Sequence, residues 1–210
     1  MKSSKVLEML IKGYIEELKA ELKDEIYKES LKAKPNAKKR YAAMKKYFTY
    51  VTSVREACSK PAIVEFQGEE YTSFCNSYSL VLTTESCGEM VMFDSNKGTY
   101  PDVTRLIHFE GEEDVIDISD VIARAKSQGY KLKRSAVMDN DFLMKYKGNY
   151  FRIGLVDSTF GVIDDGEKPT VYCNPNSNRP LTIKNNLGVC VVMPVRIEGG
   201  PADGTVVIEV

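Results

Sequence analysis

A buried β-strand is predicted by the stretch Gly188-Val189-Cys190-Val191-Val192-Met193-Pro194-Val195-Arg196. Its apolar residues follow one another without alternating with polar ones, which is typical of a strand covered on both faces. Pro194 has no backbone N–H to donate, so we expect it near an edge of the sheet. Further apolar runs predict that the end of the chain is β, with strands at 170–173, 181–184 and 205–210.

The composition is that of a globular protein with an ordinary core. The 210 residues are 43% hydrophobic and 28% charged, with a formal net charge of -1, so global charge indicates no class of partner. The five cysteines include no C-x-x-C pair, which predicts reduced thiols rather than a zinc site or a disulfide framework. Because neither a signal peptide nor a membrane-spanning run is seen, we expect a cytoplasmic protein that has no membrane partner.

Two helices are predicted at the start of the chain, where apolar residues recur at steps of three and four. The first runs from Lys5 to Leu31 and presents an apolar stripe, so residues 1–34 are interpreted as an N-terminal amphipathic helical extension. Pro35 ends it, and Asn36 can cap a second helix from Ala37 to Ser59. Residues 35–210 are then expected to form an α+β domain.

The middle of the chain mixes short strands and helices. Gln67-Gly68 predicts a tight hairpin turn between two strands, because glycine adopts positive φ at no steric cost. A third helix is expected from Ser119, as N-cap, to a stop at Gly129. The remaining predictions are strands at 79–83, 89–93 and 142–146, a turn at 147–149 and a helix at 150–163.

Candidate catalytic groups are few. His108 is the only histidine, and a Cys-His enzyme would need it beside Cys75 or Cys87, which no local pattern indicates. The carboxylate pairs Asp139 with Asp141 and Asp164 with Asp165 lie in turn-like contexts and lack the spacing of a calcium loop. No glycine-rich phosphate-binding motif occurs. The sequence therefore predicts no enzyme, no metal and no cofactor.

Local charge is more informative than net charge. Between Ser30 and Arg55 there are eight lysines and arginines and no aspartate or glutamate. Steps of seven residues place several of them on one face of the second helix. Contact with nucleic-acid phosphates and a merely solvated lysine face remain equal alternatives. The DNA-binding candidates are Lys38, Lys39, Arg40, Lys45, Lys46 and Arg55.

The opposite sign gathers between Phe109 and Ala123, which contains no lysine or arginine. The acidic residues are Glu110, Glu112, Glu113, Asp114, Asp117 and Asp120. They suit a solvated loop and the start of a helix, where the dipole favours negative charge. The alternative is that the two patches of opposite sign pair across a head-to-tail subunit interface.

Two segments carry a family resemblance. Residues 189–196, Val-Cys-Val-Val-Met-Pro-Val-Arg, resemble the closing strand of bacterial DNA polymerase III beta sliding clamps, and residues 100–107, Tyr-Pro-Asp-Val-Thr-Arg-Leu-Ile, are similar to a Tyr-Pro-Asp-x-x-Arg-Leu-Ile stretch of that family. Two looser similarities lie at 149–152 and at 60–62 taken together with 76–81. All four occur in clamp order.

The resemblance implies a clamp-like α+β module with a mixed or antiparallel sheet, a few helices lining a basic surface that faces DNA, and an N-terminal helical extension added to it. In the family the closing strand also borders an apolar pocket for short partner peptides. On that basis the partner-binding candidates are Val192, Met193, Pro194, Val195 and Arg196, for which a buried core strand is the alternative. The family's chains carry three clamp domains, whereas this chain has room for about one or a shortened pair, and it continues past Arg196.

Three hypotheses follow. The first is a non-catalytic clamp-like protein, such as a phage or mobile-element accessory factor, that binds double-stranded DNA and replication proteins and assembles as a homo-oligomer. The second is a protein-interaction or assembly module with the clamp fold but no DNA binding. The third, least favoured, is a Cys-His enzyme.

Overall fold

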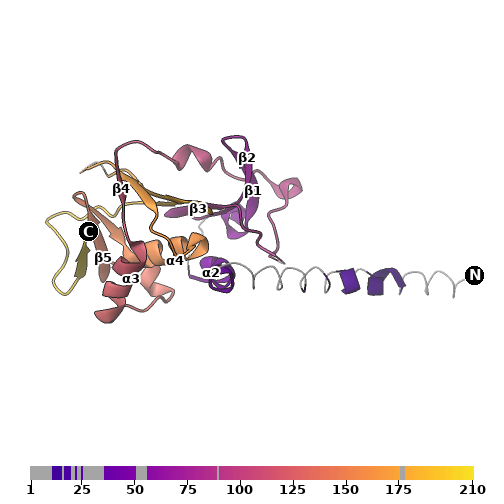
Figure 1. The fold of residues 1–210 in the computed structure, drawn as a ribbon, viewed down its shortest axis with the longest axis horizontal. Helices are drawn as coiled ribbons and strands as arrows, with labels where there is room; N and C mark the ends of the chain where they lie inside the picture. Colours follow the sequence, from indigo (N-terminus) through magenta and orange to yellow (C-terminus); the bar gives the residue numbers. More distant parts are fainter. Residues whose placement is uncertain are drawn as a thin grey trace, which may run out of the picture.

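The computed structural model describes residues 11–15, 17–19, 22, 25, 36–50, 56–88, 90–175 and 178–210. It confirms the α+β class, with two sheets and a layer of helices against one of them (Figure 1). The described residues before 36 are helical, as expected, and their apolar side chains are exposed. Among the residues described, no helix combines the length and the apolar character that crossing a membrane requires.

The larger sheet has seven antiparallel strands with β9 at its centre. In spatial order they are β1 (Ala62–Phe66), β2 (Glu69–Cys75), β3 (Ser79–Thr83), β9 (Gly188–Val192), β8 (Leu181–Asn185), β7 (Thr170–Cys173) and β4 (Glu112–Val115). Strand β9 pairs with both β3 and β8, and all five of its residues are buried. This position confirms the prediction of a covered strand, although the strand ends at Val192.

The smaller sheet joins the end of the chain to its middle. It consists of β10 (Val206–Glu209), β5 (Phe142–Tyr146) and β6 (Asn149–Arg152). Strand β10 runs parallel to β5, and β5 forms a hairpin with β6 around Lys147 and Gly148, which both have positive φ. The tail beyond Arg196 is therefore a structural part of this sheet.

The main sheet contains a repeated unit that the sequence does not reveal. Helix α2 (Ala37–Tyr50) leads, through the short helix η1 (Glu56–Ser59), into the meander β1-β2-β3, and helix α4 (Ile153–Ile163) leads into the meander β7-β8-β9. The two units meet where β3 pairs with β9. Inspection of the sequence finds no repeat because the shared pattern is one of elements and burial rather than of identical residues.

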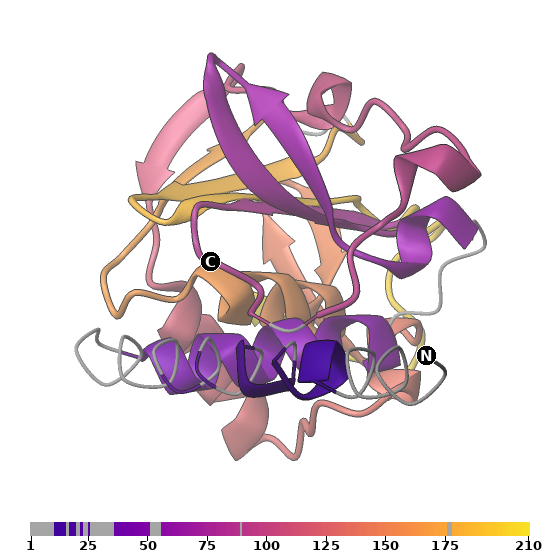
Figure 2. The same cartoon turned by 90° about the vertical axis from the view of Figure 1, so that its right-hand side faces the viewer.

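The two helices lie side by side, with α4 against the sheet and α2 against α4 (Figure 2). Nine of the eleven residues of α4 are buried. Gly154 allows the short helix η4 (Ser135–Val137) to approach, because a Cβ on Gly154 would lie 2.0 Å from the carbonyl oxygen of Ala136. Helix α3 (Ile118–Ser127) packs against α4 and β10.

The side chains of β9 divide the interior into two clusters. Cys190 and Val192 point into the main core, where the helices cover the sheet. Val189 and Val191 point to the outer face and pack with Leu80, Leu82, Val103 and Ile107. The outer cluster is covered by the long connection from β3 to β4, which includes the short helices η2 (Ser95–Lys97) and η3 (Thr104–Leu106).

Several local predictions differ from the structure. The described part of 89–93 is not a strand, and the acidic stretch supplies β4. Helix α3 is capped by Asp117, whose carboxylate accepts a hydrogen bond from the Asp120 N–H, rather than by Ser119. The predicted helix at 150–163 begins at Ile153, because residues 149–152 pair with β5.

Candidate interaction surfaces

Helix α2 presents a lysine face to solvent. Lys38, Lys45 and Lys46 are exposed, and the helix contains no acidic residue. The ammonium of Lys45 lies 4.3 Å from the centre of the Tyr41 ring, which orients it by a cation–π contact. Lys39 is also exposed, but its Nζ lies 2.6 Å from a carboxylate oxygen of Asp164. Lys39 therefore contributes less net positive charge than its three neighbours.

Arg40, which the sequence placed among the DNA-binding candidates, is buried. It is 2% exposed, its guanidinium lies 3.5 Å from the Glu85 carboxylate, and its NH1 donates to the main-chain carbonyl of Asp164. Because the burial holds this guanidinium inside the protein, Arg40 is not part of the exposed lysine face. Arg55 lies outside the described residues.

Helix α4, which lies beside α2, adds no basic residues to this face. Helix α4 contains no lysine or arginine, and its partly buried Asp157 accepts a hydrogen bond from the Tyr130 hydroxyl. Burial raises the pKa of Asp157, and the ammonium of Lys126, 4.0 Å away, opposes that shift. The lysine face is thus one helix wide.

The candidate partner-binding segment 192–196 begins in the core and ends in solvent. Val192 is fully buried and points into the main core, so its side chain is a core residue. The N–H of Met193 donates to the carbonyl of Tyr78, and the N–H of Val195 donates to the carbonyl of Tyr150. Met193, Pro194 and Val195 are half-buried and Arg196 is exposed.

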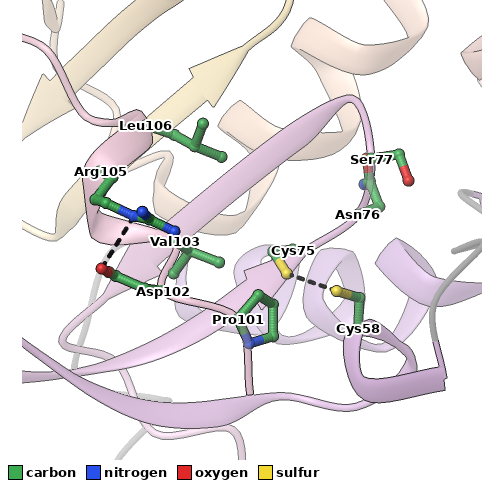
Figure 3. Close-up of a pocket in the computed structure, with 9 residues that line it drawn as sticks. All are labelled: Cys58, Cys75, Asn76, Ser77, Pro101, Asp102, Val103, Arg105 and Leu106. Carbon is green, nitrogen blue, oxygen red and sulfur yellow. Dashed lines mark hydrogen bonds and ion pairs between the residues drawn. The ribbon is translucent and has the colours of Figure 1, made fainter. Parts of the chain in front are cut away.

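A groove of about 470 Å³ lies on the outer side of the sheet (Figure 3). One wall comes from the 101–106 segment, with the apolar side chains of Pro101, Val103 and Leu106. The Arg105 guanidinium and the Asp102 carboxylate, 3.1 Å apart, form a charged rim. The other lining residues are Cys58, Cys75, Asn76 and Ser77.

The groove borders a turn that contacts the segment 192–196. The turn that supplies Asn76 and Ser77 continues into Tyr78, which accepts the hydrogen bond from Met193. The Asn76 side chain fixes this turn by accepting from the N–H groups of Tyr78 and Ser79. Among the lining residues the sequence singled out only Cys75, as a candidate nucleophile, although the Tyr-Pro-Asp stretch that contains Pro101 and Arg105 was the available signal for the others.

The acidic patch is largely neutralised within the chain. The carboxylate of Glu110 lies 2.8 Å from Arg179, and the ammonium of Lys147 lies 2.7 Å from both Glu112 and Asp114. The two Lys147 pairs hold β4 and the β5–β6 turn together. The patch therefore has less free negative charge than the sequence suggests.

The candidate catalytic residues do not form a recognisable centre. His108 is exposed, Cys75 contacts the Cys58 thiol, and burial raises the pKa of the Cys87 thiol, which disfavours its thiolate. Asp164 accepts from the Gly166 N–H in the predicted turn. Within the described ranges, no group of three histidine, cysteine, aspartate or glutamate side chains is arranged to hold a metal ion.

Comparison with known proteins identifies the fold. No protein-family model and no curated protein sequence matches the chain. Solved structures do: the DNA polymerase III beta subunit of Borrelia burgdorferi, solved with a natural product, matches with a TM-score of 0.50 and 10% identity over 76% of this chain and 62% of that one. The beta subunit of Thermotoga maritima matches with a TM-score of 0.50 and 10% identity over 79% of this chain and 64% of that one.

These likenesses show a clamp-like fold, and they agree with the fold that the sequence resemblance implied. The chain spans less than two thirds of the length of the beta subunits it matches.

Proposed function

We propose that this chain is a non-catalytic clamp-like protein that binds DNA and replication partners, as an accessory factor of a phage or mobile element would. The single observation that carries the DNA part is the exposed lysine face of α2, where Lys38, Lys45 and Lys46 stand without acidic neighbours on their helix. Lysines spaced along one face can each neutralise a phosphate and release counterions. One helix covers only part of a duplex, so enclosing DNA requires several copies of the chain.

The outer groove supports the partner-binding part of the proposal. Its apolar wall and its position beside Met193 suit a short peptide with apolar side chains, held by Pro101, Val103 and Leu106. Apolar pockets with a few polar groups at the rim are the usual form of such sites. The partner residues are accordingly Met193 to Arg196 together with the groove, whereas Val192 supports the site from the core.

Duplex binding measured against salt concentration tests the DNA part. Fluorescence anisotropy with a labelled random-sequence duplex should give an affinity that falls steeply as salt rises, because each phosphate contact contributes about 0.9 to the slope of log K against log salt. Absence of binding even at low salt would contradict the proposal.

A second candidate function is an assembly module that keeps the fold but does not bind DNA. The observation favouring it is the apolar side of the N-terminal helix, where Ile11, Tyr14, Ile15, Leu18 and Leu22 are 43–63% exposed. An apolar helix stripe gains stability when another surface covers it. Removal of residues 1–34 should then convert an oligomer into a monomer in light scattering, while Lys12→Gln should leave the oligomer intact. A monomer both with and without the helix would exclude this function.

A further inference from the structure

Two thiols meet in the outer groove. The Sγ atoms of Cys58, in η1, and Cys75, at the end of β2, are 3.2 Å apart (Figure 3). A disulfide bond is about 2.05 Å long, so an approach of about 1 Å would bring the two atoms to bonding distance. The residues are 4% and 3% exposed, yet both line the groove, which gives small reagents a route to them.

The other three cysteines have other kinds of partner. The Cys87 thiol contacts the Met92 sulfur at 3.2 Å, and the Cys190 thiol donates to the carbonyl of Thr159. Cys173 lies 3.5 Å from the side-chain amide of Asn149. Burial raises the pKa of Cys173 and Cys190, which disfavours their thiolates. Cys58 and Cys75 differ from these three because each has the other thiol as its partner and both line the groove, and thiol exchange requires access to the sulfur.

We propose that Cys58 and Cys75 are a thiol modification site that forms a reversible disulfide with a small-molecule disulfide, such as oxidised glutathione, as the oxidant. One protein thiolate attacks the glutathione disulfide, whose S–S bond breaks and releases one glutathione thiolate. The second protein thiolate attacks the protein sulfur of the mixed disulfide and releases the second glutathione. The protein loses two electrons and two protons, and the oxidised glutathione gains them.

The Tyr100 hydroxyl lies 3.1 Å from the Ser73 hydroxyl and interacts electrostatically with Cys75 and Cys58. Burial raises the pKa of Tyr100, so this hydroxyl stays neutral, and the two protons lost by the protein thiols are gained by the two released glutathione thiolates. The new bond would tie η1 to the end of β2. Formation of this cross-link does not depend on what the groove binds.

Mass spectrometry of the full chain tests the inference. The folded protein is equilibrated with mixtures of oxidised and reduced glutathione and quenched with acid, and free thiols are alkylated in denaturant before digestion. The expected product is one cross-linked peptide pair joining Cys58 to Cys75, lighter by two hydrogens, with Cys87, Cys173 and Cys190 alkylated. Treatment with excess dithiol should restore alkylation at both positions.

Matched variants complete the experiment. Cys87→Ser should give the same cross-link, whereas Cys58→Ser should leave Cys75 as a mixed disulfide with glutathione. Circular dichroism on the same samples reports whether each protein is folded. If Cys58→Ser does not fold, the wild-type result alone tests the proposal. The inference is overturned if the folded wild-type protein keeps both thiols free in oxidised glutathione, stops at the mixed disulfide, or joins either cysteine to another partner.

Discussion

The guanidinium of Arg40 lies 3.5 Å from the carboxylate of Glu85, and their side chains are 3% and 6% exposed. Arg40 also donates to the carbonyl of Asp164, at the end of the buried helix α4. One residue of a basic helix thus ties that helix to the interior, while the lysines beside it remain in solvent. Within α2, the buried Arg40 therefore serves stability, whereas the exposed lysines are the residues that we propose contact DNA.

Single substitution of either member of this pair should be strongly destabilising. Arg40→Ala or Glu85→Ala breaks a buried ion pair from one side only, which costs about 3–5 kcal/mol of unfolding free energy. The double variant with Arg40→Met and Glu85→Leu should lose much less, because no uncompensated charge remains. Urea denaturation measures all three. A loss below about 1 kcal/mol in both single variants would contradict the assigned role.

Removal of one lysine from the exposed face should weaken DNA binding without changing stability. Lys45→Gln is expected to reduce the slope of log K against log salt by about 0.9. Lys184→Gln is the charge-matched control, because its exposed side chain lies on the outer face of the sheet over the Phe109 ring. Equal effects of the two substitutions would indicate that net charge, rather than the α2 face, governs binding.

A charge in the groove should weaken peptide binding. Leu106 is 41% exposed at the groove wall, so Leu106→Asp should disturb folding little and weaken binding of short leucine- and phenylalanine-containing peptides at least about tenfold, which is about 1.4 kcal/mol. Labelled peptides of this composition, and the same peptides with alanine in place of leucine and phenylalanine, provide the measurement. Val115→Asp, at a position 67% exposed on the edge strand β4, is the control.

Substitution of two glycines of α4 by alanine should change the stability of the protein to different extents. Gly154→Ala places a Cβ 2.0 Å from the Ala136 carbonyl oxygen, so the overpacking should cost about 1–3 kcal/mol. Gly161→Ala meets only the Ala43 side chain, at 3.4 Å, and should stay within about 1 kcal/mol of the wild type because helix propensity improves. Thermal unfolding checks the pair, and a larger loss for Gly161→Ala would reverse our interpretation of this helix contact.

Asp157 should make stability depend on pH. Burial raises its pKa in the folded protein, so the folded state binds more protons than the unfolded state between the ordinary and the raised value. Its contribution to stability therefore falls as pH rises through that interval. Asp157→Asn keeps an acceptor for the Tyr130 hydroxyl and should raise the melting temperature at neutral pH, with the gain shrinking as pH falls toward the ordinary aspartate range. A gain that grows at low pH would contradict the assigned cause.

Local patterns predicted much of the fold. The Gln67-Gly68 turn, the β5–β6 turn at Lys147-Gly148 and the central strand at 188–192 follow from residue conformational preferences and from apolar runs, which act within a few residues. The strand β4 was missed because three of its four residues are acidic, and its pairing with β7 depends on a partner nearly 60 residues away.

The interaction surfaces were predicted less completely. Helical periodicity identified the exposed lysines but placed Arg40 among them, because burial of an arginine beside Glu85 depends on the tertiary packing of α2 on α4. Val192 was chosen with its neighbours, yet the alternation of β9 directs Val191, not Val192, toward the outer cluster next to the groove. The groove joins residues from three separate segments, and single-segment patterns do not encode such a junction.

The pairing of β3 with β9 has a consequence for synthesis on the ribosome. Strand β3 is completed roughly a hundred residues before β9, a delay of about 5–20 s at ordinary translation rates. During that interval its apolar segment Ser-Leu-Val-Leu-Thr has an unpaired edge, which is the feature that chaperones shield and that drives aggregation of nascent chains. The yield of folded protein in the cell therefore depends on how long this edge stays protected before residues 188–192 emerge.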